Sequence, residues 1–245
     1  MNGPRTCAVV PTYENPLTVR RVVEGIRERG LEVILVDDGS SSPGDEACKE
    51  IETAGLATRI RLARNSGKGA AVKAGFQRAS ELGFTHAFQI DADGQHDLDR
   101  IADFLEASTE NPEALILAYP VYDETAPRHR EIGRRFTTMW VALEVGSRTA
   151  IRDALIGFRI YPLASSLGVG RTGDRMDFDV EIAVRLVRAG TPTVNLPVRV
   201  HYPTEEEGGV SHFRMFQDNV RFSFLHGRLC TAGCLQWLRR AVTKR

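Results

Sequence analysis

The stretch that decides the fold is His86-Ala-Phe-Gln-Ile90, followed at once by Asp91-Ala-Asp-Gly-Gln-His96. Five residues with aromatic and β-branched members, entered from a glycine and left through acidic residues and glycine, predict a short buried strand that ends in a polar loop. The carboxylates of Asp91 and Asp93 are therefore expected at the carboxyl end of a strand, the edge where open α/β sheets bind ligands. Alternate residues of an extended chain share a face, which predicts that both carboxylates point the same way.

This acidic loop has the residue types of a divalent metal site. Hard cations such as Mg²⁺ and Mn²⁺ are bound by carboxylate, amide and phosphate oxygens. Asp91, Asp93 and Gln95 would form part of such a shell, which a diphosphate could complete. The alternative is a solvated turn in which Asp and Gly serve only the backbone.

Strand and helix patterns alternate along the rest of the chain in units of about thirty residues. Strands are expected at 6–10, 31–36, 58–62, 86–90, 114–118, 155–161 and 193–202, and helices at 19–30, 45–54, 68–82, 101–107, 136–145 and 179–189. Such alternation is typical of a mostly parallel sheet with helices on both faces and right-handed crossovers. The sequence therefore predicts an α/β protein with a Rossmann-like first half.

Composition narrows the class of protein further. The 245 residues are 42% hydrophobic and 26% charged, and 32 basic residues balance 32 acidic ones, so no overall field attracts nucleic acid. The four cysteines form no C-x-x-C pair, which argues against a structural zinc site or a disulfide scaffold. No signal-peptide core and no run of 18 apolar residues is found, so we expect a cytoplasmic protein without a spanning helix.

The last segment, 219–245, differs from everything before it. It carries six Lys or Arg and no Asp or Glu, interleaved with Phe, Leu and Trp. A basic amphipathic segment of this kind can lie in the headgroup layer of an anionic membrane. The alternative is a terminal helix that packs on the sheet with its charges in water.

Four polar loops follow the predicted strands: Pro11-Thr-Tyr-Glu14, Asp37-Asp-Gly-Ser40, Arg64-Asn-Ser-Gly-Lys-Gly69 and the acidic loop 91–96. All four would open on the same edge of a parallel sheet. The Gly67-Lys68-Gly69 turn into a helix could offer N–H groups and an ammonium to phosphate, although it is not a P-loop. Convergence of the four loops points to a nucleotide site.

The ordered set of Val-Val-Pro-Thr-Tyr-Glu (9–14), Val-Asp-Asp-Gly-Ser-Ser (36–41), the segment 64–76 and Asp-Ala-Asp-Gly-Gln-His (91–96) resembles a family 2 glycosyltransferase of GT-A fold. The branch it resembles most contains dolichyl-phosphate mannose synthase and bacterial polyprenyl-phosphate sugar transferases. The likeness is tight over about 120 residues and looser through segments 152–159, 178–182 and 209–214.

The resemblance implies roles on the donor side. Nucleotide-sugar binding falls to Pro11, Tyr13, Glu14, Asp37, Asp38, Lys68, Asp91 and His212, with Asp38 on the base and Lys68 near the nucleotide. Asp91, Asp93 and Gln95 would hold Mg²⁺ or Mn²⁺ against the diphosphate. Members of this family invert the anomeric centre by one in-line displacement, so a β-linked product is expected.

On the acceptor side the resemblance implies phosphate contacts by Arg128, Arg134, Arg135 and Arg159, since guanidinium groups bind phosphate bidentately. Catalytic roles are expected for Asp93, Asp153 and Asp179. Asp153 is the first candidate for a base or an acceptor-positioning group, and Asp179 has helix capping as its alternative. A lipid phosphate is already an anion and needs little help from a base, whereas a hydroxyl acceptor must lose its proton.

Together these observations predict a GT-A domain over 1–218, with a nucleotide-binding half (1–120) and an acceptor-binding half (121–218), followed by the amphipathic tail. The expected activity is metal-assisted, inverting transfer of a hexose-type sugar from a UDP- or GDP-sugar to a membrane lipid, polyprenyl phosphate first. A peripheral place on the cytoplasmic membrane face would follow from the tail. The alternatives are the same chemistry on a hydroxyl acceptor, a sugar nucleotidyltransferase and a non-catalytic nucleotide-sugar sensor.

Overall fold

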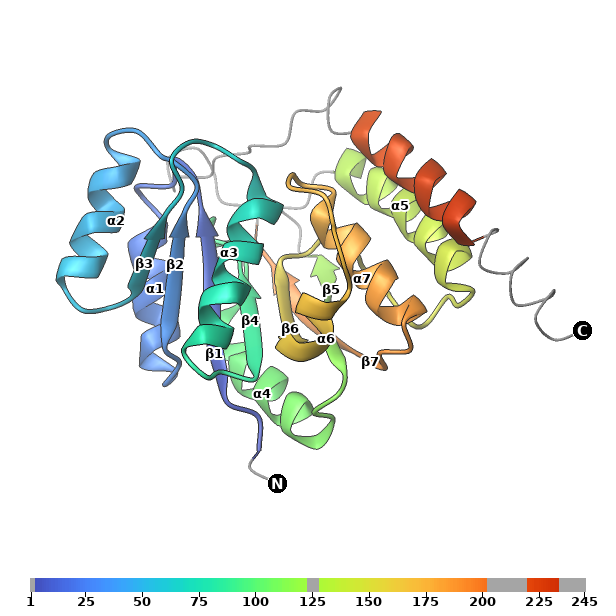
Figure 1. The fold of residues 1–245 in the computed structure, drawn as a ribbon, viewed down its shortest axis with the longest axis horizontal. Helices are drawn as coiled ribbons and strands as arrows, with labels where there is room; N and C mark the ends of the chain where they lie inside the picture. The colour runs from blue at the N-terminus through green and yellow to red at the C-terminus, as the bar shows by residue number, and fades with distance from the viewer. Residues whose placement is uncertain (1–2, 123–127, 202–219, 234–245) are drawn as a thin grey trace, which may run out of the picture.

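The computed structural model describes residues 3–122, 128–201 and 220–233, and its centre is one seven-stranded sheet (Figure 1). The strand order is β3-β2-β1-β4-β6-β5-β7. The strands are β1 (Thr6–Thr12), β2 (Val33–Asp37), β3 (Thr58–Arg61), β4 (His86–Ile90), β5 (Leu115–Tyr122), β6 (Phe158–Pro162) and β7 (Thr193–Val200). Every pairing is parallel except those that β6 makes with β4 and β5.

Helices cover both faces of the sheet. They are α1 (Val19–Glu28), α2 (Gly44–Thr53), α3 (Lys68–Glu81), α4 (Ile101–Glu110), α5 (Arg128–Val145), α6 (Leu163–Gly168) and α7 (Phe178–Arg188), with a short 3₁₀ turn at Leu98–Arg100. Helices α1, α2 and α4 pack on one face, and α3, α6 and α7 pack on the other. The expected α/β, mostly parallel, helix-flanked architecture is confirmed.

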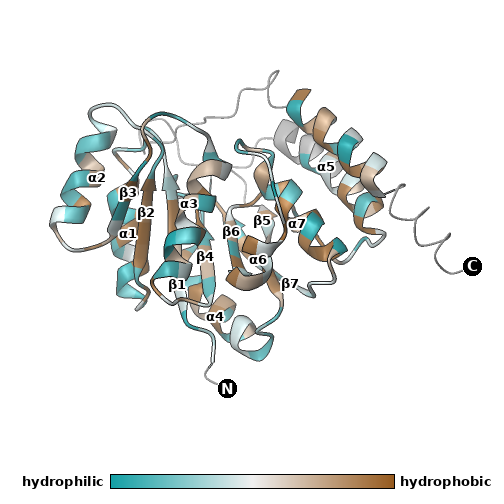
Figure 2. Ribbon diagram, viewed as in Figure 1, coloured by the Kyte–Doolittle hydropathy of each residue, from teal (hydrophilic) through white to brown (hydrophobic). Residues whose placement is uncertain are grey.

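The central strands are apolar on both sides because both faces are covered. Strands β2, β4 and β6 are buried at every position, and the brown colour of β2 in Figure 2 contrasts with the mixed colours of the helices. The core under α3 and α7 contains Val9, Val36, Phe76 and Phe178. The core under α1 and α4 contains Phe88 and Phe104. This rigid sheet fixes the edge at which the polar loops emerge.

The main differences from the sequence expectations lie in the second half of the chain. The strand expected at 114–118 continues to Tyr122 as β5. The segment expected to be a strand at 155–161 forms β6 only from Phe158, and β6 runs antiparallel. The helix expected from residue 136 begins at Arg128. A short helix, α6, follows β6 where no helix was expected.

The described part of the C-terminal segment is a helix over 220–233 that lies beside α5 (Figure 1). Leu225 and Leu229 are buried in the core shared with α5 and α7. Arg188 of α7 donates to the carbonyl oxygens of Glu144 (2.9 Å) and Leu229 (2.8 Å), so it ties the two helices together. The remainder of the predicted tail, residues 234–245, lies outside the described residues.

Candidate active site

The carboxyl ends of β1, β2 and β4 meet at one edge of the sheet because these strands are parallel neighbours. The loops that follow them are joined directly to one another. Glu14 accepts from the backbone N–H of Ser41 at 2.7 Å, and Asp38 accepts from the backbone N–H of Gly67 at 2.7 Å. Lys68 of the third loop pairs with Asp91 of the acidic loop at 2.7 Å, so the four polar loops form one connected rim at one edge of the sheet, as the sequence predicted.

Glu14 is held in an unusual backbone conformation at this rim. Its φ is 52°, a region that non-glycine residues seldom adopt, and its N–H donates to the Ser40 hydroxyl at 3.1 Å. The carboxylate also accepts from the Ser41 hydroxyl at 2.6 Å. Of the other residues expected to hold the nucleoside, Pro11 is buried within β1 and Tyr13 is half-buried in the loop.

Asp37 and Asp38 occupy very different environments. Asp37 is fully buried, and ion pairs with Arg59 (2.7 Å) and Arg61 (3.1 Å) tie β2 to β3. Burial would raise the pKa of Asp37, but the bonds to Arg59 and to the Ser40 N–H outweigh it and lower that pKa. Asp38 accepts from Ser66 and Gly67 N–H groups at 2.7 Å each, and burial raises its pKa. Both carboxylates hold the rim together, and their contact with a base stays a prediction.

Lys68 lies between two carboxylates from distant parts of the chain. Its Nζ is 2.7 Å from Asp91 Oδ2 and 2.7 Å from Asp179 Oδ2. Burial alone would lower the pKa of the ammonium, but the negative charges of Asp179 and Asp91 outweigh it and raise that pKa above its usual value. Burial would raise the pKa of Asp179, yet Lys68 and Arg159 hold it below the ordinary range. These two carboxylates therefore favour the charged form of Lys68 at the acidic loop.

Buried polar side chains of β4 and β6 hold Asp179 in place beside Lys68. Gln89 of β4 donates to Asp179 Oδ1 at 3.0 Å, and Arg159 of β6 donates to the Asp179 carbonyl at 2.7 Å. Arg159 also donates to the Ile156 carbonyl at 2.6 Å and has no exposed surface. The structure thus places Arg159 beneath the site as a support for Asp179, away from the surface where an acceptor was expected to meet it.

Asp91 sits directly against the backbone of Gly157. A Cβ atom at residue 157 would lie only 2.2 Å from both carboxylate oxygens of Asp91. The Asp91 N–H donates to the Gly157 carbonyl at 3.1 Å, which continues the β4–β6 ladder. Burial raises the pKa of Asp91, and Asp93 adds to that rise. Only glycine leaves room for the carboxylate at this place.

The residues of the acidic loop fit a divalent ion by the chemistry of their donors. Residues 92 and 93 form a turn closed by Gly94 at φ 72°, so the Asp pair is brought together by a turn and not by an extended strand. Asp91 Oδ1 is buried and has no hydrogen-bond partner in the described part of the chain. The backbone of Gln95 is used by Asp93 and His201, which leaves its side-chain amide as an oxygen donor. Among the described residues no three His, Cys, Asp or Glu side chains gather to hold an ion alone, so ligand oxygens would have to complete the shell.

Asp153 is buried at the start of the loop that leads into β6. Its Oδ1 accepts from the N–H groups of Leu155 and Ile156 at 2.8 Å each, and its Oδ2 pairs with Arg134 at 2.9 Å. Only 3% of the residue is exposed. This carboxylate caps a turn and anchors α5.

A cavity of about 800 Å³ opens beside Asp153, between α5 and the end of β5. It is lined by Tyr119, Pro120, Arg134, Thr138, Met139, Ala142, Leu143, Gly146, Ser147, Arg148, Arg152 and Asp153. The Arg152 guanidinium lies over the Tyr119 ring, 3.9 Å from its centroid. The cavity combines three arginines with an apolar wall.

Some expected site residues cannot be placed. His212 lies outside the described residues. The backbone of Arg128 and Arg135 is helical within α5, but their side chains are not described. Their expected roles stay predictions.

A family model described as Glycosyl transferase family 2 matches residues 7–164, which include all four rim loops. The chain belongs to glycosyl transferase family 2. The family 2 resemblance drawn from the rim motifs is therefore confirmed, and the chain is an enzyme of that family.

Two relatives show where in the family the similarity lies. The chain is 26% identical over 230 residues to polyprenol monophosphomannose synthase of Mycolicibacterium smegmatis, covering 89% of this chain and 83% of the relative. It is 26% identical over 199 residues to glycosyltransferase AglJ of Haloferax volcanii, covering 80% of this chain. The chain spans 63% of the length of AglJ.

Solved structures confirm the fold. Glucosyl-3-phosphoglycerate synthase from Mycobacterium tuberculosis, in complex with Mn²⁺ and uridine-diphosphate-glucose, superposes with a TM-score of 0.65 at 14% identity, over 95% of this chain and 79% of that one. Mannosyltransferase PcManGT from Pyrobaculum calidifontis, in complex with GDP-Man and Mn²⁺, superposes with a TM-score of 0.59 at 17% identity, over 83% of this chain and 59% of that one. Both were crystallised with Mn²⁺, which is consistent with divalent metal use at a site of this fold.

The sequence analysis missed Gly157, Tyr119, Arg148 and Arg152. Gly157 and Arg152 lie in the segment 152–159 that carries part of the family likeness, but only the register of β6 against β4 brings Gly157 to Asp91, so no role was predicted for it. A local signal did exist for Asp153, because an aspartate that accepts from the N–H groups two and three residues later is a common turn device.

Proposed function

We propose that this chain transfers a hexose-type sugar from a UDP- or GDP-sugar to polyprenyl phosphate, with inversion and with help from Mg²⁺ or Mn²⁺. The donor part rests on the connected rim and on Lys68 between Asp91 and Asp179. Asp91, Asp93 and the Gln95 side chain would hold the ion, which supplies a Lewis acid for the departing diphosphate. The Lys68 ammonium adds a fixed positive charge where negative charge develops.

The observation that supports a phosphate acceptor is that both oxygens of the Asp153 carboxylate are already bound by other groups of the chain. A general base for a hydroxyl acceptor needs a carboxylate free to take a proton. Asp153 is bound by two N–H groups and Arg134, and Asp179 is bound by Lys68 and Gln89. Both candidate bases are thus occupied in the described part of the chain. An acceptor that is already an anion needs no base, which favours a phosphate.

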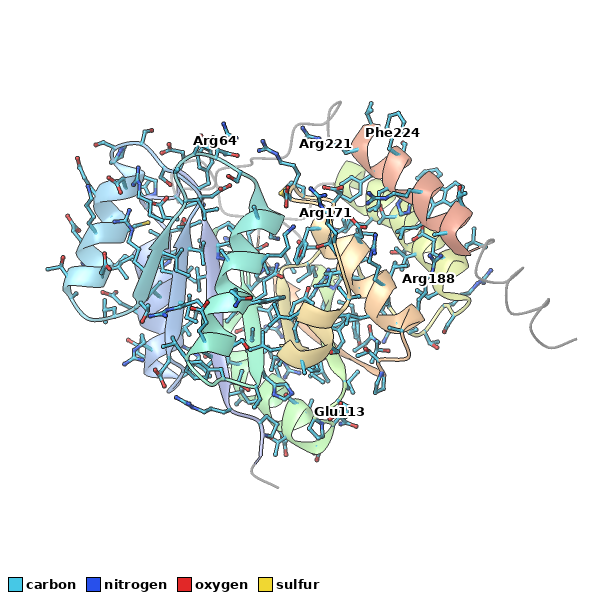
Figure 3. All side chains as sticks on the ribbon, in the orientation of Figure 1. Arg64, Glu113, Arg171, Arg188, Arg221 and Phe224 are labelled. Carbon is cyan, nitrogen blue, oxygen red and sulfur yellow. The ribbon has the colours of Figure 1, made fainter. Side chains whose placement is uncertain are left out.

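The lipid part of the proposal rests on an exposed apolar face beside the cavity. On α5, Phe136, Met139 and Leu143 are 63%, 50% and 66% exposed, and on the neighbouring helix Phe224 is 77% exposed. Figure 3 shows Phe224 pointing away from the body of the molecule, with Arg221 at the start of the same helix. None of the described helices is long and apolar enough to cross a bilayer. We infer that this face lies on a membrane surface, where apolar side chains enter the headgroup layer.

The donor part is tested by thermal shift with UDP, GDP, CDP and dTDP, each with and without Mn²⁺, on the wild type and on Asp93→Ala. Binding to the native state raises its stability by roughly 2.7 kcal/mol at a hundred times the dissociation constant. We expect a metal-dependent shift with UDP or GDP that Asp93→Ala abolishes. Absence of a shift with all four nucleotides would remove the role proposed for the acidic loop.

The acceptor part is tested with Asp153→Asn. The amide keeps an oxygen for the two N–H groups but cannot act as a base. If Asp153 is structural, we expect a kcat within about ten-fold of wild type, whereas loss of a general base costs about 10²–10⁴-fold. A loss in the larger range, with the melting temperature preserved, would contradict base-free transfer.

A further inference from the structure

Two arginines of the acceptor-side cavity carry a charge that no described acidic side chain neutralises. Arg134 is already paired with Asp153 at 2.9 Å. Arg148 and Arg152 line the same cavity, and in the part of the chain that the structure describes neither makes an ion pair. Among the described residues, the lining of the cavity therefore has a positive charge that no acidic side chain compensates, which is the environment that an anion requires.

Arg152 is held in place even though it is exposed. Its guanidinium is stacked on the Tyr119 ring at 3.9 Å from the centroid, and its backbone N–H donates to Asn195 Oδ1 at 3.0 Å. The Asn195 amide in turn donates to the carbonyl oxygens of Thr149 and Ala150 at 3.2 and 3.1 Å. A stacked guanidinium keeps its N–H edge available, and a fixed fork binds phosphate with little loss of side-chain freedom.

Part of the lining of this cavity is apolar. Met139, Ala142 and Leu143 of α5 form this wall, and it continues onto the exposed face of that helix. An occupant that satisfies both the arginines and this wall has an anionic head and a hydrocarbon chain. Asp153, in the same cavity, is only four residues before Gly157, which contacts Asp91, so the head would lie on the side of the cavity nearest the acidic loop.

We propose that Arg152, assisted by Arg148, binds the phosphate of the acceptor, while the α5 wall binds the start of its isoprenoid chain. This inference rests on the proposed function, and it assigns the phosphate contact to two arginines outside the set expected from the sequence, which was Arg128, Arg134, Arg135 and Arg159. Arg134 then serves to hold Asp153.

The experiment measures equilibrium binding of a short-chain prenyl monophosphate to the full-length chain, together with steady-state kinetics. Arg152→Gln should weaken prenyl phosphate binding and raise the acceptor KM by about ten-fold or more, because charge-assisted hydrogen bonds are lost. Nucleotide affinity should not change. Arg152→Lys should recover part of the loss, since it keeps the charge but not the fork. Arg78→Gln, an exposed arginine of α3 paired with Glu81, is the matched control.

The results of these binding and kinetic measurements either support or overturn the phosphate site at Arg152. Equal prenyl phosphate affinity in Arg152→Gln and Arg78→Gln would overturn it, and so would a parallel loss of nucleotide binding, which would mark Arg152 as a support of the fold. If the wild type binds prenyl phosphate through Arg152 but transfers no sugar to it, the anion site stands and the proposed function fails. A selective rise in acceptor KM with wild-type donor affinity supports both.

Discussion

Replacement of Gly157 by alanine should damage the acidic loop without damaging the fold. The added Cβ would lie 2.2 Å from both oxygens of the Asp91 carboxylate, and contacts of real Cβ atoms essentially never fall below 3.0 Å. The carboxylate must therefore move by about 0.8 Å, the difference between these two distances. Metal–ligand distances in a well-formed site lie within about 0.2 Å of their usual values. The displaced Asp91 would no longer be placed for the ion or for Lys68.

Disruption of groups that orient metal ligands typically costs about 10–100-fold in metal affinity. For Gly157→Ala we expect a loss in this range, equal to roughly 1.4–2.8 kcal/mol. Titration of Mn²⁺ followed by electron paramagnetic resonance, in the presence of a nucleoside diphosphate, reads the affinity without relying on catalysis. The melting temperature is measured on the same samples.

Gly168→Ala is the matched control. This glycine ends α6 and does not need a positive φ, and no atom of the described residues lies within 4 Å of an added Cβ. It should bind Mn²⁺ as the wild type does. Wild-type Mn²⁺ affinity in a folded Gly157→Ala variant would refute the reasoning, because it would mean that Asp91 does not need its observed position.

Three further predictions follow from the same contacts. Lys68→Met leaves two buried carboxylates facing each other, so the free energy of unfolding measured in urea should fall by about 3–5 kcal/mol. The pKa of Asp37 in the folded state lies below its ordinary value of 3.8. The stability that this carboxylate contributes is therefore present above pH 3.8 and is lost as the pH falls through the folded-state pKa. Asp37→Asn should accordingly lower the melting temperature strongly at pH 7 and less at pH 3. Leu143→Asp on α5 should reduce flotation with anionic liposomes, whereas Leu82→Asp at the end of α3 should not.

Much of the fold followed from local patterns. Strands β1, β2 and β4 are short apolar runs that end in polar loops, and parallel pairing then brings those loops to one edge. The direction of β6 could not be predicted in this way, because its apolar residues are buried on both faces and would read the same in either direction. The antiparallel direction is a property of the tertiary pairing of β6 with β4 and β5, which local periodicity does not describe.

The site was predictable where the residues are adjacent in sequence and not where tertiary contacts decide their roles. Asp91 and Asp93 were found from one loop, but the turn that joins them and the contact with Gly157 depend on β6. Arg159 carries the same charge as a surface arginine, and only its place on a central strand shows that it supports Asp179. The positions of Arg148 and Arg152 beside Arg134 likewise need the packed α5.

The most direct test of the central claim is a comparison of two acceptors that differ only in the phosphate. The wild-type chain is incubated with Mn²⁺, a UDP- or GDP-sugar and either a polyprenyl phosphate or the matching polyprenol, and the lipid product is identified by mass and by the anomeric coupling in NMR. We predict a β-linked sugar on the phosphate and no product from the polyprenol. Efficient glycosylation of the polyprenol, with none of the phosphate, would contradict the account.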